Sequence, residues 1–320
     1  MSVIASASPS LALIKYWGKL PGGANLPATP SLAVTLDGLR TVTRIAGAPH
    51  GAAHDVVTVA GEALPPEGFK AFIDRFRARS GSTRRVLVSS DSTFPTAAGL
   101  ASSSSGYAAL AVGLNAYFRT GMPVRELSAV ARTGSGSACR AVYGGFTVWR
   151  AGSERAEPLL APDHWPELRV LVVVLSSERK AISSRAAMAR SAETSPIYRA
   201  WCEESGAIFD RGVDALVRRD IASLGAAMRE SYLFMFSTMF TARPPVIYWL
   251  PQSVALLGEI ERLRADGLPV YETMDAGPQV KLLTTATHVQ EIVRRVRATA
   301  PAADVIASAP GGSPDVIDER

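Results

Sequence analysis

A run of small and hydroxylic residues, from Phe94 to Gly106, is the part of this chain best suited to bind phosphate. It reads FPTAAGLASSSSG and continues into an apolar stretch from Tyr107 to Phe118. Small residues let backbone N–H groups approach an oxyanion closely, and the N-terminus of a following helix adds free donors and the positive end of its dipole. The serines Ser102 to Ser105 supply hydroxyl donors. The segment therefore predicts a cradle for a triphosphate.

Two common nucleotide-binding motifs and a flexible linker fit this segment less well. The GxxxxGK[ST] pattern of a Walker A loop is missing, and so is the GxGxxG pattern of a dinucleotide-binding loop. A flexible serine linker is the plain alternative, but the apolar residues Phe94 and Leu100 to Leu114 flank the serines on both sides. A linker would not be embedded between a strand and a buried helix.

A carboxylate and a guanidinium stand in turn-rich segments further along the chain. Asp275 comes at the end of a predicted strand, before Ala276-Gly277-Pro278, a turn that can expose it. A carboxylate there can accept a proton from a reacting hydroxyl or orient it, although Asp before Gly is also common in ordinary turns. Arg140 follows a Gly/Ser segment and can bind a carboxylate or a phosphate through two parallel hydrogen bonds.

The elements that must position these groups follow from periodicity. Alternating or continuous apolar and β-branched patterns predict strands at 40–45, 55–60, 86–90 and 169–175. The spacing of Phe69, Phe72, Ile73 and Phe76 predicts an amphipathic helix over 68–80, and a shorter helix is expected at 125–132. The phosphate cradle is thus expected to join a strand to a helix.

Helical patterns dominate beyond about residue 180, which places a domain boundary there. Helices are expected at 205–219, 221–240, 252–265 and 288–299, and strands at 268–274, 279–284 and 303–308. The division predicts a domain over 1–180 that carries the phosphate loop and a domain over 181–320 that carries Asp275. The last ten residues, GGSPDVIDER, are expected to fray.

Composition favours a soluble globular protein. The chain has 320 residues, of which 47% are hydrophobic and 20% charged, enough for more than one compact domain. Two cysteines, Cys139 and Cys202, cannot form a disulfide framework, and four scattered histidines argue against a zinc enzyme. The net charge of +5 favours anionic partners such as phosphorylated metabolites or nucleic acid, but no basic stripe interleaved with aromatic residues indicates base stacking.

The first residues, MSVIASASPSLALIKYWGK, lack a basic region before an apolar run, so no signal peptide is predicted. No uncharged apolar stretch reaches the roughly 18 residues needed to span a bilayer. The expected location is therefore the cytoplasm, with no membrane partner.

Four blocks in a fixed order resemble the GHMP kinase superfamily, and within it the diphosphomevalonate decarboxylase family. They are Ile14-Lys-Tyr-Trp-Gly-Lys19 with Asn25-Leu-Pro27, the phosphate loop FPTAAGLASSSSGYAALA, Ala131-Arg-Thr-Gly-Ser-Gly-Ser-Ala-Cys-Arg140 with Tyr143-Gly-Gly145, and Thr273-Met-Asp-Ala-Gly-Pro278. The match spans residues 14 to 283 and is weak over 190–265.

The resemblance implies an α+β fold of two lobes. An N-terminal lobe like ribosomal protein S5 domain 2 would carry the phosphate loop, and a ferredoxin-like C-terminal lobe would supply Asp275. It implies ATP and Mg²⁺ as cofactors and the decarboxylation of (R)-5-diphosphomevalonate to isopentenyl diphosphate, ADP, phosphate and CO2, a step of isoprenoid biosynthesis by the mevalonate pathway. The partner is then a small phosphorylated mevalonate rather than nucleic acid, and homodimers are common in the family.

The family's site residues carry over onto matching positions of this chain. The resemblance gives catalytic roles to Asp275 at the substrate's 3-hydroxyl, Arg140 at its carboxylate, Lys15 beside Asp275 or the reacting phosphate, and Ser103 at the transferred phosphoryl and as the candidate Mg²⁺ ligand. Substrate-binding roles fall on Tyr16, Lys19, Ser135, Ser137, Arg140, Ser184 and Arg185. ATP-binding roles fall on Pro95, Ala98, Gly99, Leu100, Ala101, Ser102, Ser103, Ser104 and Ser105. Taken alone, the KYWGK segment also fits an amphipathic strand end with snorkelling lysines, and Ser183-Ser184 also fits a helix N-cap.

Three positions depart from the family's pattern. Ser92-Thr93 stand where the family usually has Asn before Phe-Pro, Thr29-Pro30-Ser31 replace its Asn-Ser-Ser, and Gln279 replaces the Asn after Asp-Ala-Gly-Pro. Rival functions therefore stay open. One is a decarboxylase or 3-kinase acting on mevalonate 5-phosphate, mevalonate 3,5-bisphosphate or mevalonate. From other classes, a non-catalytic nucleotide-binding homologue and an RNA-binding protein are the alternatives.

Overall fold

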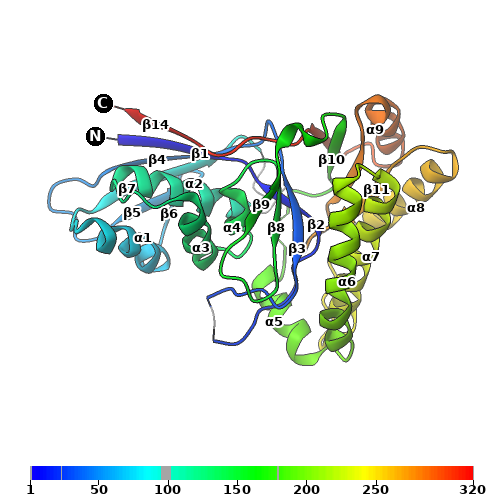
Figure 1. Cartoon of the computed structure of the whole chain (residues 1–320), viewed down its shortest axis with the longest axis horizontal. Coiled ribbons are helices and arrows are strands. Elements are labelled where there is room, and N and C mark those ends of the chain that lie inside the picture. The colour runs from blue at the N-terminus through cyan, green and yellow to red at the C-terminus, as the bar shows by residue number, and fades with distance from the viewer. Residues whose placement is uncertain (1, 23, 95–101, 179, 320) are drawn as a thin grey trace.

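The computed structural model describes residues 2–22, 24–94, 102–178 and 180–319 of the chain. Within these residues the strands form three sheets, one of six strands and two of four. Figure 1 shows one lobe on the left, which holds both chain termini, and a second lobe on the right, built largely from long helices. No helix in the described ranges is long and apolar enough to cross a membrane.

The six-stranded sheet of the first lobe has the strand order β14-β1-β4-β7-β5-β6. Its strands are β14 (Asp315–Glu319), β1 (Ser2–Ala7), β4 (Thr41–Gly47), β7 (Val86–Ser92), β5 (Val56–Val59) and β6 (Glu62–Leu64). Burial alternates along β4, so that Thr41, Thr43 and Ile45 face the core while Val42 is exposed. This alternation is the period of a strand with one covered face, and it explains why the pattern at 40–45 predicted a strand correctly.

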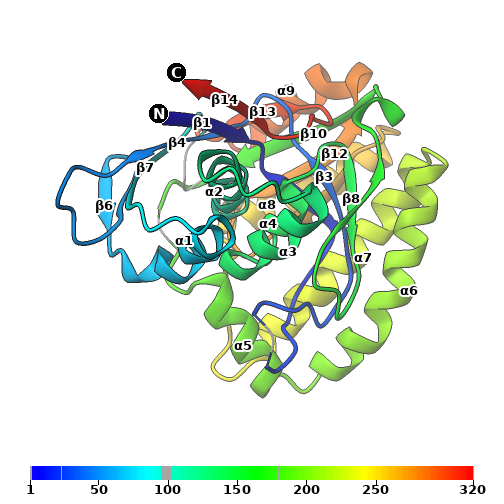
Figure 2. The same ribbon diagram turned by 60° about the vertical axis from the view of Figure 1, so that its left-hand side comes forward.

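Helices cover the inner face of this sheet, as Figure 2 shows for α1 and α2. The helices of this lobe are α1 (Glu67–Ser80), α2 (Ser102–Tyr117), α3 (Val124–Gly134) and α4 (Ala138–Ala141). In α1 the predicted apolar spacing buries Phe72, Ile73 and Phe76. The helix ends at Gly81, whose left-handed φ of 68° lets its N–H bond the carbonyl of Arg77. The predicted helices at 68–80 and 125–132 are thus confirmed.

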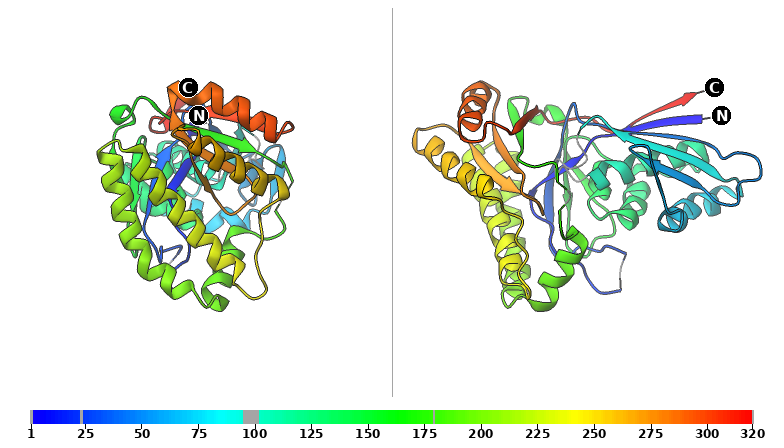
Figure 3. Two further views of the ribbon diagram at one scale, coloured as in Figure 1. Left: turned by 90° about the vertical axis from the view of Figure 1, so that its right-hand side faces the viewer. Right: turned by 180° about the vertical axis from the view of Figure 1, so that it is seen from behind.

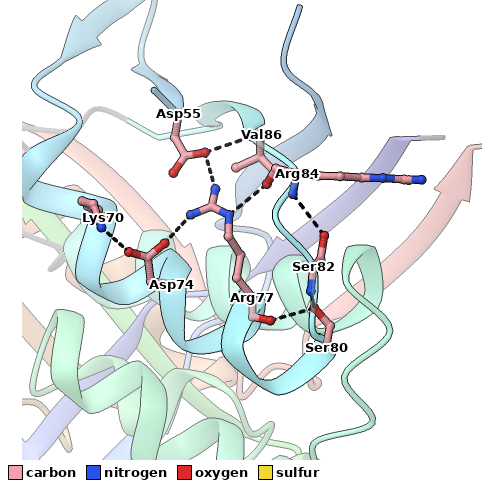
Figure 4. Close-up of polar contacts among 8 residues, drawn as sticks. All are labelled: Asp55, Lys70, Asp74, Arg77, Ser80, Ser82, Arg84 and Val86. Atoms are coloured by element: carbon pink, nitrogen blue, oxygen red, sulfur yellow. Dashed lines mark hydrogen bonds and ion pairs between the residues drawn. The ribbon is translucent and has the colours of Figure 1, made fainter. Parts of the chain in front are cut away.

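Arg77 on α1 is a buried arginine whose charge is balanced by carboxylates (Figure 4). Its guanidinium forms ion pairs with Asp55 and Asp74, and its Nε donates to the carbonyl of Arg84 at 2.8 Å. Asp55 Oδ1 also accepts from the backbone N–H of Val86 at 2.9 Å. This network ties α1 to the start of β7, and it offsets the cost of burying the guanidinium.

A second sheet, of four strands in the order β2-β3-β8-β9, lies in the middle of the molecule (Figure 1). Its strands are β2 (Ser10–Ile14), β3 (Ser31–Thr35), β8 (Phe146–Trp149) and β9 (Glu157–Leu160). All residues of β2, β3 and β8 are buried. Because these short strands are covered on both faces, they show no polar-apolar alternation, and periodicity did not predict them.

The third sheet, in the order β11-β12-β10-β13, forms the base of the second lobe. Its strands are β11 (Tyr271–Met274), β12 (Val280–Thr285), β10 (Leu168–Val174) and β13 (Asp304–Ser308), each antiparallel to its neighbour. They confirm the strands predicted at 169–175, 268–274, 279–284 and 303–308. The sheets do not follow the predicted domain boundary at residue 180. Strand β10 precedes it but belongs to the third sheet, and β14 follows it but belongs to the six-stranded sheet of the first lobe.

Helices surround this third sheet. They are α5 (Ser184–Thr194), α6 (Tyr198–Val217), α7 (Ile221–Phe240), α8 (Pro251–Ala265) and α9 (Val289–Thr299), with short 3-10 turns at Pro162–His164 and Ala286–His288. Figure 3 shows α6 and α7 as a long pair at the end of the molecule opposite the chain termini. Leu256 and Ile260 of α8 and Ile292 of α9 join a buried core cluster with Leu171 of β10. The four helices predicted in this half are therefore confirmed.

The predicted fraying of the last ten residues is wrong. Residues Asp315 to Glu319 form β14, which pairs antiparallel with β1 from Ser6 back to Ser2. Figure 1 shows the two chain ends side by side at the edge of the sheet. The partner strand comes from the opposite end of the chain, so no local pattern could show that these residues have backbone hydrogen-bond partners.

Candidate active site

Asp275 lies in the turn between β11 and β12, where two lysines hold its carboxylate. Lys15 Nζ is 2.7 Å from its Oδ1, and Lys281 Nζ is 3.2 Å from its Oδ2. Both lysine side chains are 1–2% exposed, whereas 28% of the Asp275 side chain remains exposed. The carboxylate is therefore accessible to a ligand, with buried cations behind it.

Three segments far apart in the sequence build this cluster. Lys15 directly follows β2, and its backbone N–H donates to Ser231 Oγ of α7 at 2.8 Å. Its Nζ also donates to the carbonyl of Ala12 at 2.8 Å, which fixes the side chain along β2. Lys281 lies on β12, opposite Thr273 of β11. Packing of the central sheet against α7 and the third sheet thus brings Lys15 to Asp275.

Burial and charge set the protonation of these groups. Burial lowers the pKa of Lys15 to about 8, against the opposing effect of Asp275. Burial alone would raise the pKa of Asp275, but the charges and hydrogen bonds of Lys15 and Lys281 together hold it well below its usual range. Asp275 is therefore ionised at neutral pH, and it is a weak base that is well suited to orient a hydroxyl.

Arg140 on α4 is a second buried arginine, and its surroundings differ from those of Arg77. It is 2% exposed, and its Nη1 donates to Ser31 Oγ of β3 at 2.6 Å. Among the described residues no carboxylate lies within ion-pair distance, and its buried Nε has no hydrogen-bond partner. Burial lowers the pKa of Arg140, while Asp275 acts in the opposite direction. In contrast to Arg77, this guanidinium has donors to offer to an oxyanion from outside the chain.

Three serine hydroxyls form a row beside this region. Ser103 Oγ, at the start of α2, is 3.2 Å from Ser135 Oγ, which is 3.4 Å from Ser137 Oγ. Ser103 is exposed and the other two are half-buried. The hydroxyl of Ser103, predicted to bind ATP, therefore lies beside those of Ser135 and Ser137, which were predicted to bind the substrate.

The remaining loop serines turn inward. Ser104 and Ser105 have no exposed surface, and the Ser105 hydroxyl is 2.7 Å from Thr41 Oγ1 of β4. The Ser105 side chain therefore packs against the sheet rather than toward a ligand, whereas the buried Ser104 hydroxyl has no hydrogen-bond partner among the described residues. The other predicted ATP-binding positions, Pro95, Ala98, Gly99, Leu100, Ala101 and the side chain of Ser102, lie outside the described residues.

Tyr16 lies against the segment 133–137. Its ring packs on Trp149 at 4.8 Å between centroids, and a Cβ atom on Gly136 would lie 3.0 Å from the Tyr16 hydroxyl. This buried hydroxyl has no hydrogen-bond partner in the part of the chain that the structure describes, and burial raises its pKa. It is a neutral donor beside Ser135 and Ser137.

Lys19 and Arg185 bring two more positive charges to the same side. Lys19 Nζ donates to Asn25 Oδ1 at 2.7 Å, and Asn25 in turn donates to the carbonyls of Arg132 and Thr133 at 2.8 and 3.2 Å. Burial, and then the charge of Arg185, lower the pKa of Lys19. Arg185 is exposed on the first turn of α5. These cations are placed to receive a strongly negative group.

Two lysines of the site have no counterpart among the residues predicted for it. In the sequence Lys281 resembles an ordinary strand-edge lysine, yet it is buried beside Asp275; a charge inside the apolar strand VKLLTT was the available signal. No motif marks Lys180. Its Nζ donates to Ser184 Oγ at 2.8 Å and to the carbonyl of Ala276 at 2.9 Å, so it joins the start of α5 to the Asp275 turn.

The departure at Gln279 has a structural explanation. Its Oε1 accepts from the N–H of Leu175 at 2.6 Å and of Ser176 at 3.4 Å, and its Nε2 donates to the carbonyl of Ser176 at 2.5 Å. This buried amide joins the start of β12 to the segment after β10. Ser31, at another departure, supports Arg140.

Cations outnumber anions around Asp275. Lys15, Lys281, Lys180 and Arg140 all lie within electrostatic reach of Asp275, the one carboxylate among these five groups. The described residues contain no group of three or more His, Cys, Asp or Glu side chains that could hold a metal ion. The site is therefore built for a polyanionic ligand.

Two family models match the chain. A diphosphomevalonate decarboxylase-like N-terminal domain matches residues 7–159, and a mevalonate 5-diphosphate decarboxylase C-terminal domain matches residues 170–316. The chain is 34% identical over 329 residues to a diphosphomevalonate decarboxylase of Ganoderma lucidum, covering 91% of this chain and 80% of the relative.

Solved structures give the same result. The mevalonate diphosphate decarboxylase from Staphylococcus aureus is 32% identical, with a TM-score of 0.92 and coverage of 99% of this chain and 98% of that one. MDDEF in complex with MVAPP, AMPPCP and magnesium is 33% identical, with a TM-score of 0.92 and coverage of 100% and 99%.

Proposed function

The chain belongs to the diphosphomevalonate decarboxylase family, and on that premise we propose that it converts (R)-5-diphosphomevalonate and ATP to isopentenyl diphosphate, ADP, phosphate and CO2. The observation that carries the proposal is the ionised Asp275, held by Lys15 and Lys281 in a site rich in cations. The relative crystallised with MVAPP, AMPPCP and magnesium supports a phosphorylated mevalonate and a nucleotide as the ligands.

The reaction must break two bonds within the substrate, the carbon–oxygen bond of the tertiary 3-hydroxyl and the carbon–carbon bond to the carboxylate. The oxygen of the tertiary 3-hydroxyl bonds to the γ-phosphorus of ATP, its proton passes to the Asp275 carboxylate as that bond forms, and the bond from that phosphorus to ADP breaks. The carbon–oxygen bond then breaks, which releases phosphate. The bond to the carboxyl carbon breaks in turn, and its electron pair forms the double bond as CO2 leaves.

The residues divide this work by their chemistry. Asp275 accepts a hydrogen bond from the 3-hydroxyl and aims its oxygen at the phosphorus. Because its pKa is held low, it orients the hydroxyl rather than removing the proton beforehand. Arg140 offers its free donor edge to the substrate carboxylate. Ser103, exposed at the start of α2, faces the transferred phosphoryl group.

The terminal diphosphate is assigned to the opposite end of the site. Tyr16, Lys19 and Arg185 supply one neutral donor and two charges there, and Ser135, Ser137 and Ser184 add hydroxyl groups. A diphosphate makes several charge-assisted hydrogen bonds, which suits a set of donors on separate elements. The free energy of binding this remote group can then be used to hold the reacting carbon in place.

Magnesium fits the residues present. Mg²⁺ usually binds through nucleotide phosphates, waters and one or two protein oxygens, so the lack of a cluster of acidic side chains among the described residues agrees with it. Ser103 offers an exposed hydroxyl oxygen for this purpose. When bound, the ion neutralises charge that develops on the nucleotide phosphates.

A substrate panel tests the proposed function. The protein is incubated with ATP–Mg²⁺ and, in turn, mevalonate, mevalonate 5-phosphate, mevalonate 3,5-bisphosphate and diphosphomevalonate, and both ADP and CO2 are measured. Equal amounts of ADP and CO2 from diphosphomevalonate are expected. ADP without CO2 would identify a kinase, and the absence of both would identify a non-catalytic homologue. Asp275→Asn should lower turnover by at least about 10²-fold.

A homodimer is also proposed, on the evidence of one sheet face. Val42, Val56 and Leu87 of the six-stranded sheet are 36–39% exposed, on strands that are neighbours in the sheet. Three exposed aliphatic side chains on adjacent strands are suited to contact a second copy. Sedimentation velocity at several concentrations checks this, and Leu87→Glu should shift the equilibrium toward monomer.

A further inference from the structure

Lys281 is a charged residue in a strand that is otherwise buried and mostly apolar. It pairs with Val172 of β10 on one side and with Thr273 of β11 on the other. Only 1% of its side chain is exposed, yet its Nζ reaches Asp275 Oδ2 at 3.2 Å. Burying an ammonium group carries a large desolvation cost, and its ion pair need not repay that cost in full. A lysine at this position is therefore not explained by stability.

The two lysines contact different oxygens of the same carboxylate. Lys15 takes Oδ1 at 2.7 Å and Lys281 takes Oδ2 at 3.2 Å. A carboxylate bound through one oxygen can still rotate about its terminal torsion, which has a broad energy profile. Bound through both, it has a single orientation, and its remaining lone pairs point in fixed directions.

We propose that Lys281 is a positioning residue for the reaction, which acts by fixing the orientation of Asp275. The proposal rests on the function proposed above, in which Asp275 aims the substrate's 3-hydroxyl. Lys15 alone keeps the carboxylate charged and in place, whereas Lys281 prevents it from turning. A misplacement of about 1 Å at a reacting group can cost roughly 10²-fold in rate, so the loss of this second contact is measurable.

Four cationic side chains surround Asp275 and affect its pKa. Lys15 comes from the end of β2, Lys281 from β12, Lys180 from the segment after β10 and Arg140 from α4. Removing Lys281 leaves three cations, so Asp275 stays ionised at neutral pH. Its pKa nevertheless rises, because one of its two contacting ammonium groups is gone.

The test compares Lys281→Met, which keeps the length and packing of the side chain, with Lys281→Arg, which restores a positive charge. Lys70→Met is the matched control, because Lys70 is an exposed lysine paired with Asp74 on α1, in the other lobe. The kcat, both KM values and the pH dependence of kcat are measured on the intact protein, after wild type has been shown to release CO2 from diphosphomevalonate.

We expect kcat of Lys281→Met to fall about 10²-fold, with both KM values changed by less than about threefold. The acid limb of its kcat profile should move to higher pH, and Lys281→Arg should recover part of kcat. Adding Lys281→Met to Asp275→Asn should produce no further loss, since both act through one carboxylate.

Unchanged kcat in folded Lys281→Met, or a fall in thermal midpoint without a moved acid limb, would overturn the proposal. So would a full additional loss in the Asp275→Asn background. If the methionine variant does not fold, Lys281→Gln is measured against the same criteria. A wild type that releases no CO2 refutes the proposed function instead, so the two failures are distinguishable.

Discussion

Two of the three buried arginines among the described residues, Arg77 and Arg140, allow one prediction to be worked through in detail. Arg77 forms ion pairs with Asp55 and Asp74 (Figure 4), whereas Arg140 has one hydrogen bond to Ser31 and, among the described residues, no carboxylate. A charge that the chain does not neutralise is best accounted for by a ligand. We therefore expect the same substitution, arginine to lysine, to have different effects at the two positions.

Arg140→Lys keeps the charge but loses the planar guanidinium, whose nitrogens can form two parallel hydrogen bonds to a carboxylate while one of them also bonds Ser31. The lost charge-assisted hydrogen bond is worth about 1.5–3 kcal/mol. At about 1.4 kcal/mol per factor of ten, kcat/KM for diphosphomevalonate should fall roughly 10- to 150-fold. The KM for ATP should be nearly unchanged, since Arg140 is assigned to the substrate carboxylate.

The assay measures ADP release while each substrate is varied at a saturating level of the other, together with the thermal midpoint. Arg77→Lys is the control: it should lower the midpoint by several degrees, at roughly 2–4 °C per kcal/mol, and leave kcat/KM unaltered. The reasoning is refuted if Arg140→Lys behaves like Arg77→Lys, with a lower midpoint and a kcat/KM within about threefold of wild type.

Four further outcomes follow from the site. Ser103→Ala should raise the KM for ATP or lower kcat about tenfold. Ser105→Ala should instead cost about 1 kcal/mol of stability and keep activity, because the Ser105 hydroxyl bonds Thr41. Kinetic assays and thermal melts of both variants distinguish the two effects. Burial lowers the pKa of Lys15 to about 8, so kcat/KM should fall as the pH rises through about 8 and Lys15 loses its proton; Lys15→Arg should remove this limb from the pH profile. Below pH 8 the charged Lys15 lowers stability, and this cost is relieved as the pH rises from about 8 toward the ordinary value of 10.5, which urea titrations at several pH values can follow. Inorganic pyrophosphate at 100 times its Kd should stabilise the protein by about 2.7 kcal/mol and so raise the thermal midpoint, while sodium chloride of equal ionic strength should not.

The family and its two-lobed α+β fold could be predicted from the sequence, and the comparisons confirm both. Short motifs carry this information because a phosphate cradle needs small residues beside one another, and a reacting hydroxyl needs a carboxylate on an exposed turn. Helices such as α1 and α7 could also be located, because their burial follows the 3.6-residue period of the chain itself.

The tertiary structure decided which groups meet. Lys15 lies 260 positions from Asp275 in the chain, Lys281 holds the opposite oxygen of the same carboxylate, and neither contact has a local signature. The same holds for β14, which pairs with β1 from the other end of the chain. Residue type and spacing are properties of a short segment, whereas burial, pKa and orientation depend on what the rest of the chain packs around it. The sequence alone therefore predicted Asp275 as the catalytic carboxylate, whereas only the tertiary structure showed that Lys281 contacts it.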